Sequence, residues 1–425
     1  MPPCHSPTSP AIHAGMRYSP RMFPRVPHIP GLTPLRGIAA LLVVVFHVDS
    51  LGGMLRLGPL LPGSGLLSRG YLWVDFFFVL SGFIMAHVYG QGFADGVRFP
   101  AVRAFAGARF ARLIPMHLVA LTFTVLAHLA TPAPGGEGGP GGGAPPDPGM
   151  ATMMAQMYDW RYLPAHAFLL LSFGLVPMSW NVPGWSIAAE WWTYFLTLPL
   201  HRGLGRIPRA VLVAFVLAGC AGLGTLAALH PSQRLDITFD LGLPRCLFGF
   251  AIGLCLHRFH REGWTERLLS TNTALLLAGA ATLAVLHFPV PPNPMPAGKD
   301  GMPAPIPGTP LADGLAPLAF AALVGAVAAH RGNALRFLET KPLGVLGNLS
   351  YAIYLMQSTA FAAYFIPAMA WRGSHPEGPM PIGMKLLLLG LVLAITIGLA
   401  ALAHRFIEKP ARHALRRRLG VDAPG

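Results

Sequence analysis

Residues 35–47 read Leu-Arg-Gly-Ile-Ala-Ala-Leu-Leu-Val-Val-Val-Phe-His, an apolar run with an arginine before it and a histidine after it. The run is typical of a transmembrane helix, and ionisable residues in such a helix are functional candidates because hydrocarbon makes them costly. Eleven helical steps separate Arg36 from His47, which places both on nearly the same face about 16 Å apart. We therefore expect Arg36 near one membrane surface and His47 deeper along the same face.

The rest of the chain has the composition of a polytopic membrane protein, since 53% of its residues are hydrophobic and only 11% are charged. The apolar piece 165–176 is too short for a comfortable span, so we expect it to be re-entrant or interfacial, with an eleventh span as the alternative. The sequence predicts an all-α fold with about ten transmembrane helices, over 32–51, 71–90, 113–131, 184–200, 209–229, 241–257, 272–288, 311–330, 343–367 and 383–404.

The distribution of basic residues predicts the topology of these helices. With ten spans, the arginine-rich loops around 98–112, 202–209 and 258–267 fall on the same side as the basic C-terminal segment. The positive-inside rule makes that side, and hence both termini, cytoplasmic. The same rule explains the net charge of +14, so we expect no nucleic-acid partner. The four cysteines show no CxxC spacing and predict neither a disulfide framework nor a metal site.

The sequence predicts one membrane domain, residues 31–412. Residues 1–30 are rich in Pro, Ser and Arg without an apolar core, which indicates a disordered cytoplasmic leader rather than a cleavable signal. Residues 413–425 are expected to form a basic cytoplasmic tail. The low-complexity segments 132–149 and 289–310 are expected to be flexible surface loops.

Further polar residues lie in or beside the other predicted spans. Asp75 precedes three phenylalanines, and Ser81-Gly82 offers a small face to another helix or to a ligand chain. Arg109 and Arg112 share a helix face and present forked donors that suit phosphate, although anchoring by the positive-inside rule is the alternative.

Two later spans carry polar residues as well. Glu190 lies among aromatic residues that include Trp185, and a carboxylate in hydrocarbon needs a partner such as histidine or arginine. In the ninth span, Ser350, Tyr354 and Gln357 fall on one helix face. Residues 405–410, which close the last span, fit an interfacial cap.

In this order, these blocks resemble the membrane-bound acyltransferase family 3, bacterial integral-membrane enzymes that O-acylate cell-surface sugars and some natural products. The resemblance covers residues 32–412 and is carried by Leu35-Arg36-Gly37…His47, Asp75-Phe76-Phe77-Phe78-Val79-Leu80-Ser81-Gly82-Phe83, Arg109…Arg112…Pro115, Trp185-Ser186…Glu190…Tyr194, residues 347–355 and Glu408-Lys409-Pro410.

The resemblance implies an acyl-CoA donor on the cytoplasmic side, with acetyl-CoA as the expected donor. Its acyl group would pass to a hydroxyl of a glycan, a glycolipid or a small molecule. His47 matches the family's essential histidine, and Arg36, Arg109 and Arg112 match positions associated with CoA binding and activity. We add Ser81 to the expected donor site.

An imidazole at His47 can act as a general base or receive the acyl group itself, and the sequence leaves both open. We expect Glu190 or Asp75 to orient or charge the histidine's partner network. Trp185, Tyr354 and Gln357 are the expected substrate contacts. Many relatives have histidine in place of Gln357, and glutamine can hydrogen-bond but cannot exchange a proton at neutral pH.

Some relatives carry an extracytoplasmic hydrolase-like domain that these 425 residues lack. We therefore expect the protein to act alone or to pass the acyl group to a separate partner. The alternative from another class is a transporter or flippase-like protein that uses Arg36, His47 and Glu190 as a substrate or proton pathway. In either case the expected location is the bacterial cytoplasmic (inner) membrane.

Overall fold

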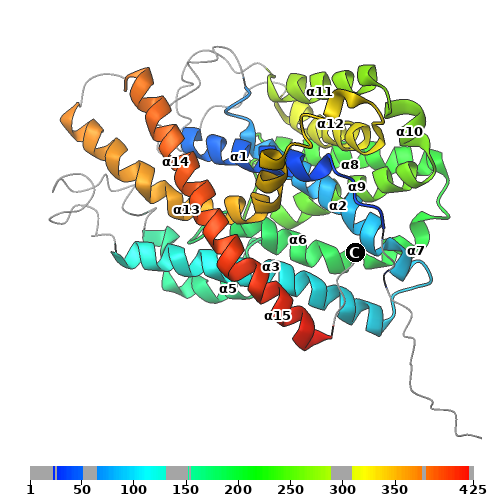
Figure 1. The fold of residues 1–425 in the computed structure, drawn as a ribbon, viewed down its shortest axis with the longest axis horizontal. Coiled ribbons are helices and arrows are strands. Elements are labelled where there is room, and N and C mark those ends of the chain that lie inside the picture. The colour runs from blue at the N-terminus through cyan, green and yellow to red at the C-terminus, as the bar shows by residue number, and fades with distance from the viewer. Residues whose placement is uncertain are drawn as a thin grey trace, which may run out of the picture.

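The computed structural model describes residues 23, 26–50, 65–130, 152, 155–288, 309–375 and 380–420. These residues form helices and connecting turns (Figure 1), which confirms the predicted all-α fold class. Residues 1–22, the segment 132–149 and most of 289–310 lie outside the described residues, so the leader and the low-complexity loops stay predictions.

Each predicted apolar stretch carries one of the longer helices. These are α1 (Leu32–Ser50), α2 (Trp73–Tyr89), α3 (Phe99–Ala130), α6 (Gly184–Leu196), α8 (Arg209–Leu229), α9 (Gly242–Arg261), α11 (Asn272–Leu286), α12 (Thr309–Ala329), α13 (Lys341–Ser374) and α14 (Ile382–Ala403). Shorter helices are α5 (Leu163–Ala167), α7 (Leu198–Leu204), α10 (Trp264–Leu269) and α15 (Lys409–Leu419).

The structure supports a multi-pass membrane protein. Within the described residues, six helical segments are long and apolar enough to cross a membrane: Leu32–Asp49, Gly70–Phe93, Phe99–Ala130, Arg209–Leu229, Thr309–Ala329 and Ile382–Leu419. The total of ten spans and the cytoplasmic placement of both termini stay predictions.

Residues 165–176 form no spanning helix. α5 ends at Ala167, and the chain then runs through turns and bends to the start of α6 at Gly184. Leu169, at φ 57°, and Trp180, at φ 40°, adopt left-handed backbone, a conformation that a continuous right-handed helix excludes. Both side chains are buried, so this irregular segment packs into the protein, as irregular backbone at membrane depth must.

Two close helix crossings position the site. A Cβ atom on Gly82 of α2 would lie 2.0 Å from the carbonyl oxygen of Phe250 in α9, and one on Gly253 would lie 2.0 Å from that of Val79. On the other side of the site, a Cβ on Gly347 of α13 would lie 2.1 Å from the carbonyl oxygen of Thr33 in α1. Small residues at these crossings let the backbones touch, as in other membrane helix pairs.

A buried ion pair joins the same two helices, α2 and α9. Arg245 donates to both carboxylate oxygens of Asp75, at 3.0 and 2.7 Å, and neither side chain is exposed. The remaining donors of Arg245 reach the carbonyl oxygens of Tyr71 and Ile237, at 2.9 Å each. The hydrogen bonds of Arg245 thus all go to groups of the protein that hold α9 against α2 and the segment before it.

A second ion pair holds the neighbouring end of α12. Arg69 donates to Asp313, which also accepts from the Tyr71 hydroxyl at 2.9 Å and from the backbone N–H of Leu235 at 2.7 Å. The two pairs therefore pin residues 235–237, in the connection between α8 and α9, to the ends of α2 and α12. Removing one partner of either pair would strand a buried charge, so each pair must be kept intact for the helices to stay in this arrangement.

Candidate active site

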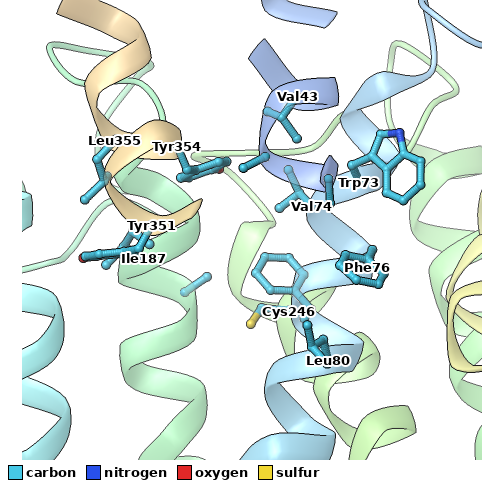
Figure 2. Close-up of a cluster of buried hydrophobic side chains, with 14 of the residues drawn as sticks. Val43, Trp73, Val74, Phe76, Leu80, Ile187, Cys246, Tyr351, Tyr354 and Leu355 are labelled. Carbon is cyan, nitrogen blue, oxygen red and sulfur yellow. The ribbon is translucent and has the colours of Figure 1, made fainter. Parts of the chain in front are cut away.

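A cavity of about 490 Å³ lies between α1, α2, α3, α6, α13 and the C-terminal helical segment. Its volume is in the range of small-molecule and cofactor sites. Its apolar walls come mainly from α2, and Figure 2 shows the adjoining buried cluster, which includes Val74 and Leu80 of α2, Ile187 of α6, and Tyr351 and Tyr354 of α13. The lining includes Arg36, Val74, Phe77, Phe78, Ser81, Arg109, Arg112, Ser186, Glu190, Tyr194, Tyr351, Tyr354, His404, Lys409, Arg412 and Arg416.

One part of the lining is cationic. Arg36 comes from α1, and Arg109 and Arg112 come from adjacent turns of α3. Arg109 is 8% exposed; its Nη2 donates to the Tyr89 hydroxyl at 2.9 Å, and its guanidinium lies 5.1 Å from the centre of that ring. The three arginines that the sequence grouped as a donor site thus line one cavity.

The carboxylate in this lining belongs to Glu190 of α6. Its Oε1 accepts from the Ser81 hydroxyl at 2.5 Å and from the Tyr194 hydroxyl at 2.6 Å. The Tyr194 ring also lies 6.0 Å from the Arg109 guanidinium. Ser81 therefore lines the cavity and is held by Glu190, and its place in the donor site stays a prediction.

His47 is not among the described residues that line this cavity, and it connects to the lining through Gln357, which lies one turn along α13 from the cavity residue Tyr354. Its Nδ1 is 3.1 Å from Oε1 of Gln357 and 3.0 Å from the carbonyl oxygen of Val43. The side-chain nitrogen of Gln357 donates to the carbonyl oxygen of Tyr354 at 2.7 Å, which fixes the amide with its oxygen toward the histidine. Tyr354 is itself a cavity residue, and its hydroxyl lies 2.8 Å from that of Ser186.

These contacts assign the tautomer of a neutral His47. Both neighbours of Nδ1 are acceptors, so Nδ1 carries the proton, and the lone pair of the neutral ring is on Nε2. An imidazole in this state can take a proton through Nε2 or attack a carbonyl carbon. Gln357 thus holds an acceptor against Nδ1 of His47, and a glutamine in this place cannot exchange a proton itself.

The expectation that Asp75 or Glu190 orients His47 is not what the contacts show. Asp75 is bound to Arg245, and Glu190 to Ser81 and Tyr194, whereas His47 contacts Gln357.

Trp185 also has a different place from the one expected of a substrate contact. Its ring lies 5.3 Å from the Arg245 guanidinium and 6.0 Å from the Phe78 ring, and its carbonyl oxygen accepts from Ser172. The neighbouring Ser186 is the residue that lines the cavity. Trp185 therefore supports the buried ion pair behind the wall.

The structure adds residues from the end of the chain. After α14 the chain makes a π-helical turn, His404–Glu408, and continues as α15. Figure 1 shows α15 lying along α3, and Lys409, Arg412 and Arg416 line the cavity beside the α3 arginines. The predicted interfacial cap and the first part of the predicted tail are therefore helical, and this helix forms one wall of the site.

Comparison with known proteins identifies the family. Residues 29–404 match the model of an acyltransferase domain, Acyl_transf_3, over most of the chain. The chain belongs to the membrane-bound acyltransferase family 3. This membership agrees with the resemblance found in the sequence and favours an acyltransferase over the transporter that the polar residues left open.

Curated relatives support the same assignment. O-acetyltransferase OatA of Staphylococcus aureus is 23% identical over 420 residues, which is 93% of this chain and 58% of the relative. The chain thus spans less than two thirds of OatA. Acyltransferase MdmB of Streptomyces mycarofaciens is 26% identical over 421 residues, covering 94% of this chain and 96% of the relative. No solved structure matches the chain.

Proposed function

We propose that this membrane acyltransferase moves a short acyl group, with acetyl as the expected one, from acyl-CoA to a hydroxyl of a glycan, a glycolipid or a small molecule. The observation that carries the proposal is the joint arrangement of the cavity and His47. The cavity has a cationic part suited to the phosphates of CoA, and its lining residue Tyr354 accepts a hydrogen bond from Gln357, which in turn contacts His47.

The arginines supply the binding part of this proposal. Arg36, Arg109 and Arg112 converge on one space from two helices, and guanidinium groups bind phosphate through paired N–H donors. Within the described residues, Arg36 and Arg112 make no hydrogen bond or ion pair, so their guanidinium groups are available to a ligand in the cavity. The apolar side chains Phe77 and Val74 suit the pantetheine arm and acyl group deeper in the cavity.

The chemistry then follows from the His47 ring. Nε2 accepts the proton of the acceptor hydroxyl as that oxygen attacks the thioester carbonyl carbon. The carbon–sulfur bond breaks, the thiolate leaves, and the imidazolium returns the proton to it. In the alternative order, Nε2 attacks the thioester carbonyl carbon, the carbon–sulfur bond breaks and the thiolate leaves. The acceptor hydroxyl then attacks the acyl carbon, the bond to Nε2 breaks, and the hydroxyl proton neutralises the thiolate. Both orders produce the same ester and free CoA.

The acceptor and the compartment are part of the same proposal. OatA is an O-acetyltransferase by name and MdmB an acyltransferase, and we take the bacterial inner membrane as the location. The acceptor would meet His47 directly, or a separate extracytoplasmic partner would carry the acyl group onward.

The test uses purified full-length protein in nanodiscs with radiolabelled acetyl-CoA and candidate acceptors. We expect acceptor-dependent release of CoA thiol and equal formation of an alkali-labile ester. Folded protein that binds CoA but releases no thiol with any hydroxyl acceptor would contradict the proposal. Loss of ester from a surface glycan in a deletion strain, restored by the parent gene, would identify the acceptor.

A further inference from the structure

The wall formed by α15 has its own charge pattern. Arg412 and Arg416 are one helical turn apart and line the cavity, whereas Arg417 and Arg418 of the same helix are exposed. Arginines therefore lie on both faces of α15. A general attraction of this helix to anionic surfaces does not explain why two of these arginines line a cavity.

The cavity collects more positive charge than its carboxylates balance. Among the described residues that line it, six are lysine or arginine, while Glu190 is the one carboxylate. Glu408 is buried behind the lining and bound to His404 at 2.7 Å. Arg412 lies within electrostatic range of both Arg112 and Arg109, and like charges gathered in a partly buried space repel one another.

The arginines also have unused donors. Within the described part of the chain, Arg412 and Arg416 line the cavity and make no hydrogen bond or ion pair. Arginines in a partly buried space are normally paired, so two unpaired guanidinium groups in one lining suit a ligand with several anionic oxygens.

The arginines of the cavity are not equally buried. Arg109 is nearly fully buried and packs on Tyr89, whereas Arg36, Arg112, Arg412 and Arg416 are all partly exposed, the last two on the final helix of the described chain. In CoA the pyrophosphate joins the pantetheine arm, while the 3′-phosphate sits on the ribose, further from the thioester. A donor with its arm toward Tyr354 would therefore present its pyrophosphate to the α3 arginines and its 3′-phosphate nearer the rim.

We propose that Arg412 and Arg416 form a subsite for the ribose 3′-phosphate of the donor, separate from the pyrophosphate site of Arg36, Arg109 and Arg112. This inference rests on the proposed acyl-CoA function and makes it more specific. The subsite makes the enzyme select CoA thioesters over donors that lack the 3′-phosphate.

The test measures the binding of CoA and of 3′-dephospho-CoA to purified full-length protein in nanodiscs. We expect the parent to bind CoA at least tenfold more tightly than 3′-dephospho-CoA. The Arg412→Gln/Arg416→Gln double variant should lose that preference, with CoA binding weakened about tenfold and dephospho-CoA binding unchanged within twofold. The Arg417→Gln/Arg418→Gln double variant removes the same charge from the exposed face and should keep the preference.

The outcomes separate this inference from the proposed function. The subsite assignment is wrong if the Arg412→Gln/Arg416→Gln variant keeps the tenfold preference for CoA, which is the result expected if these arginines contact lipid phosphates instead. It is also wrong if the variant binds CoA and 3′-dephospho-CoA more weakly by the same factor. Should that variant fail to fold, Arg412→Lys/Arg416→Lys retains the charge and is measured instead. If this lysine variant kept the full parental preference for CoA while its CoA binding depended less on salt, that result would also count against a forked phosphate contact. A parent that discriminates the two ligands but transfers no acetyl group keeps the subsite and overturns the enzymatic proposal.

Discussion

Replacing Gln357 with leucine tests whether this residue sets the state of His47. The change removes the acceptor 3.1 Å from Nδ1 and also the donor to the carbonyl oxygen of Tyr354, while the contact of Nδ1 with the Val43 carbonyl remains. Because one of the two acceptors on Nδ1 is lost, the ring should sample unproductive orientations or the wrong tautomer.

The expected size follows from the hydrogen bond that is lost. A net contribution of about 0.5–1.5 kcal/mol for such a bond corresponds to a fall in kcat of about two- to tenfold. KM for acetyl-CoA should stay unchanged, because the cationic groups proposed to bind the donor come from other helices. Gln357→His should recover most of the rate, since a ring nitrogen can replace the acceptor.

The assay is steady-state thiol release from acetyl-CoA by purified protein at saturating acceptor. Ser358→Ala is the matched control: its hydroxyl donates to Oδ1 of Asn181 at 3.0 Å, so the variant loses one hydrogen bond of the same helix without touching His47. A Gln357→Leu enzyme with parental kcat, or one whose loss lies wholly in KM, would refute the orienting role.

Three further variants test the donor site and the packing around it. Arg109→Gln should raise KM for acetyl-CoA about tenfold or more with a smaller change in kcat, as measured by initial rates; unchanged KM would make this arginine a topology anchor. Asp75→Asn should destabilise the protein by about 3–5 kcal/mol in denaturant unfolding, because it strands the buried Arg245; a change below 1 kcal/mol would contradict the pairing. Gly253→Val should lower the unfolding temperature and the activity together, since even a Cβ atom at this position meets the backbone of α2. Gly279→Val is the control: a Cβ there has no atom within 4 Å, so neither quantity should change. Equal melting curves for the two variants would contradict the close crossing of α2 and α9.

Much of the fold follows from apolar patterning alone. Ten apolar stretches each carry one of the longer helices, and 165–176 is no spanning helix, as its length indicated. The α3 helix, however, begins at Phe99, well before the apolar stretch at 113, because a membrane helix continues into charged sequence that hydropathy cannot assign.

The site was only partly predictable, for reasons that lie in long-range contacts. Arg36, Arg109 and Arg112 line one cavity, as their shared charge and predicted membrane side suggested. Asp75 was expected near the histidine, but its partner Arg245 lies 170 residues away, and no local pattern reports such a pairing.

The role of the last helix was hidden by a simpler explanation. Arginines after the final span are expected from the positive-inside rule, so Arg412 and Arg416 carried no separate signal. Their spacing of four residues on an amphipathic helix could have indicated a shared face, but which element that face meets depends on the packing of α15 against α3.

The most direct test of the central claim compares kcat for acetyl transfer in the parent, His47→Gln and His128→Gln proteins. His128 is a histidine of α3 that stacks on Tyr158, away from the residues that line the cavity. The account predicts that His47→Gln lowers kcat by about 10²–10⁴-fold, the usual contribution of general acid–base catalysis, while CoA binding and the His128→Gln enzyme match the parent. A folded His47→Gln protein that transfers acetyl groups at the parental rate would contradict the account.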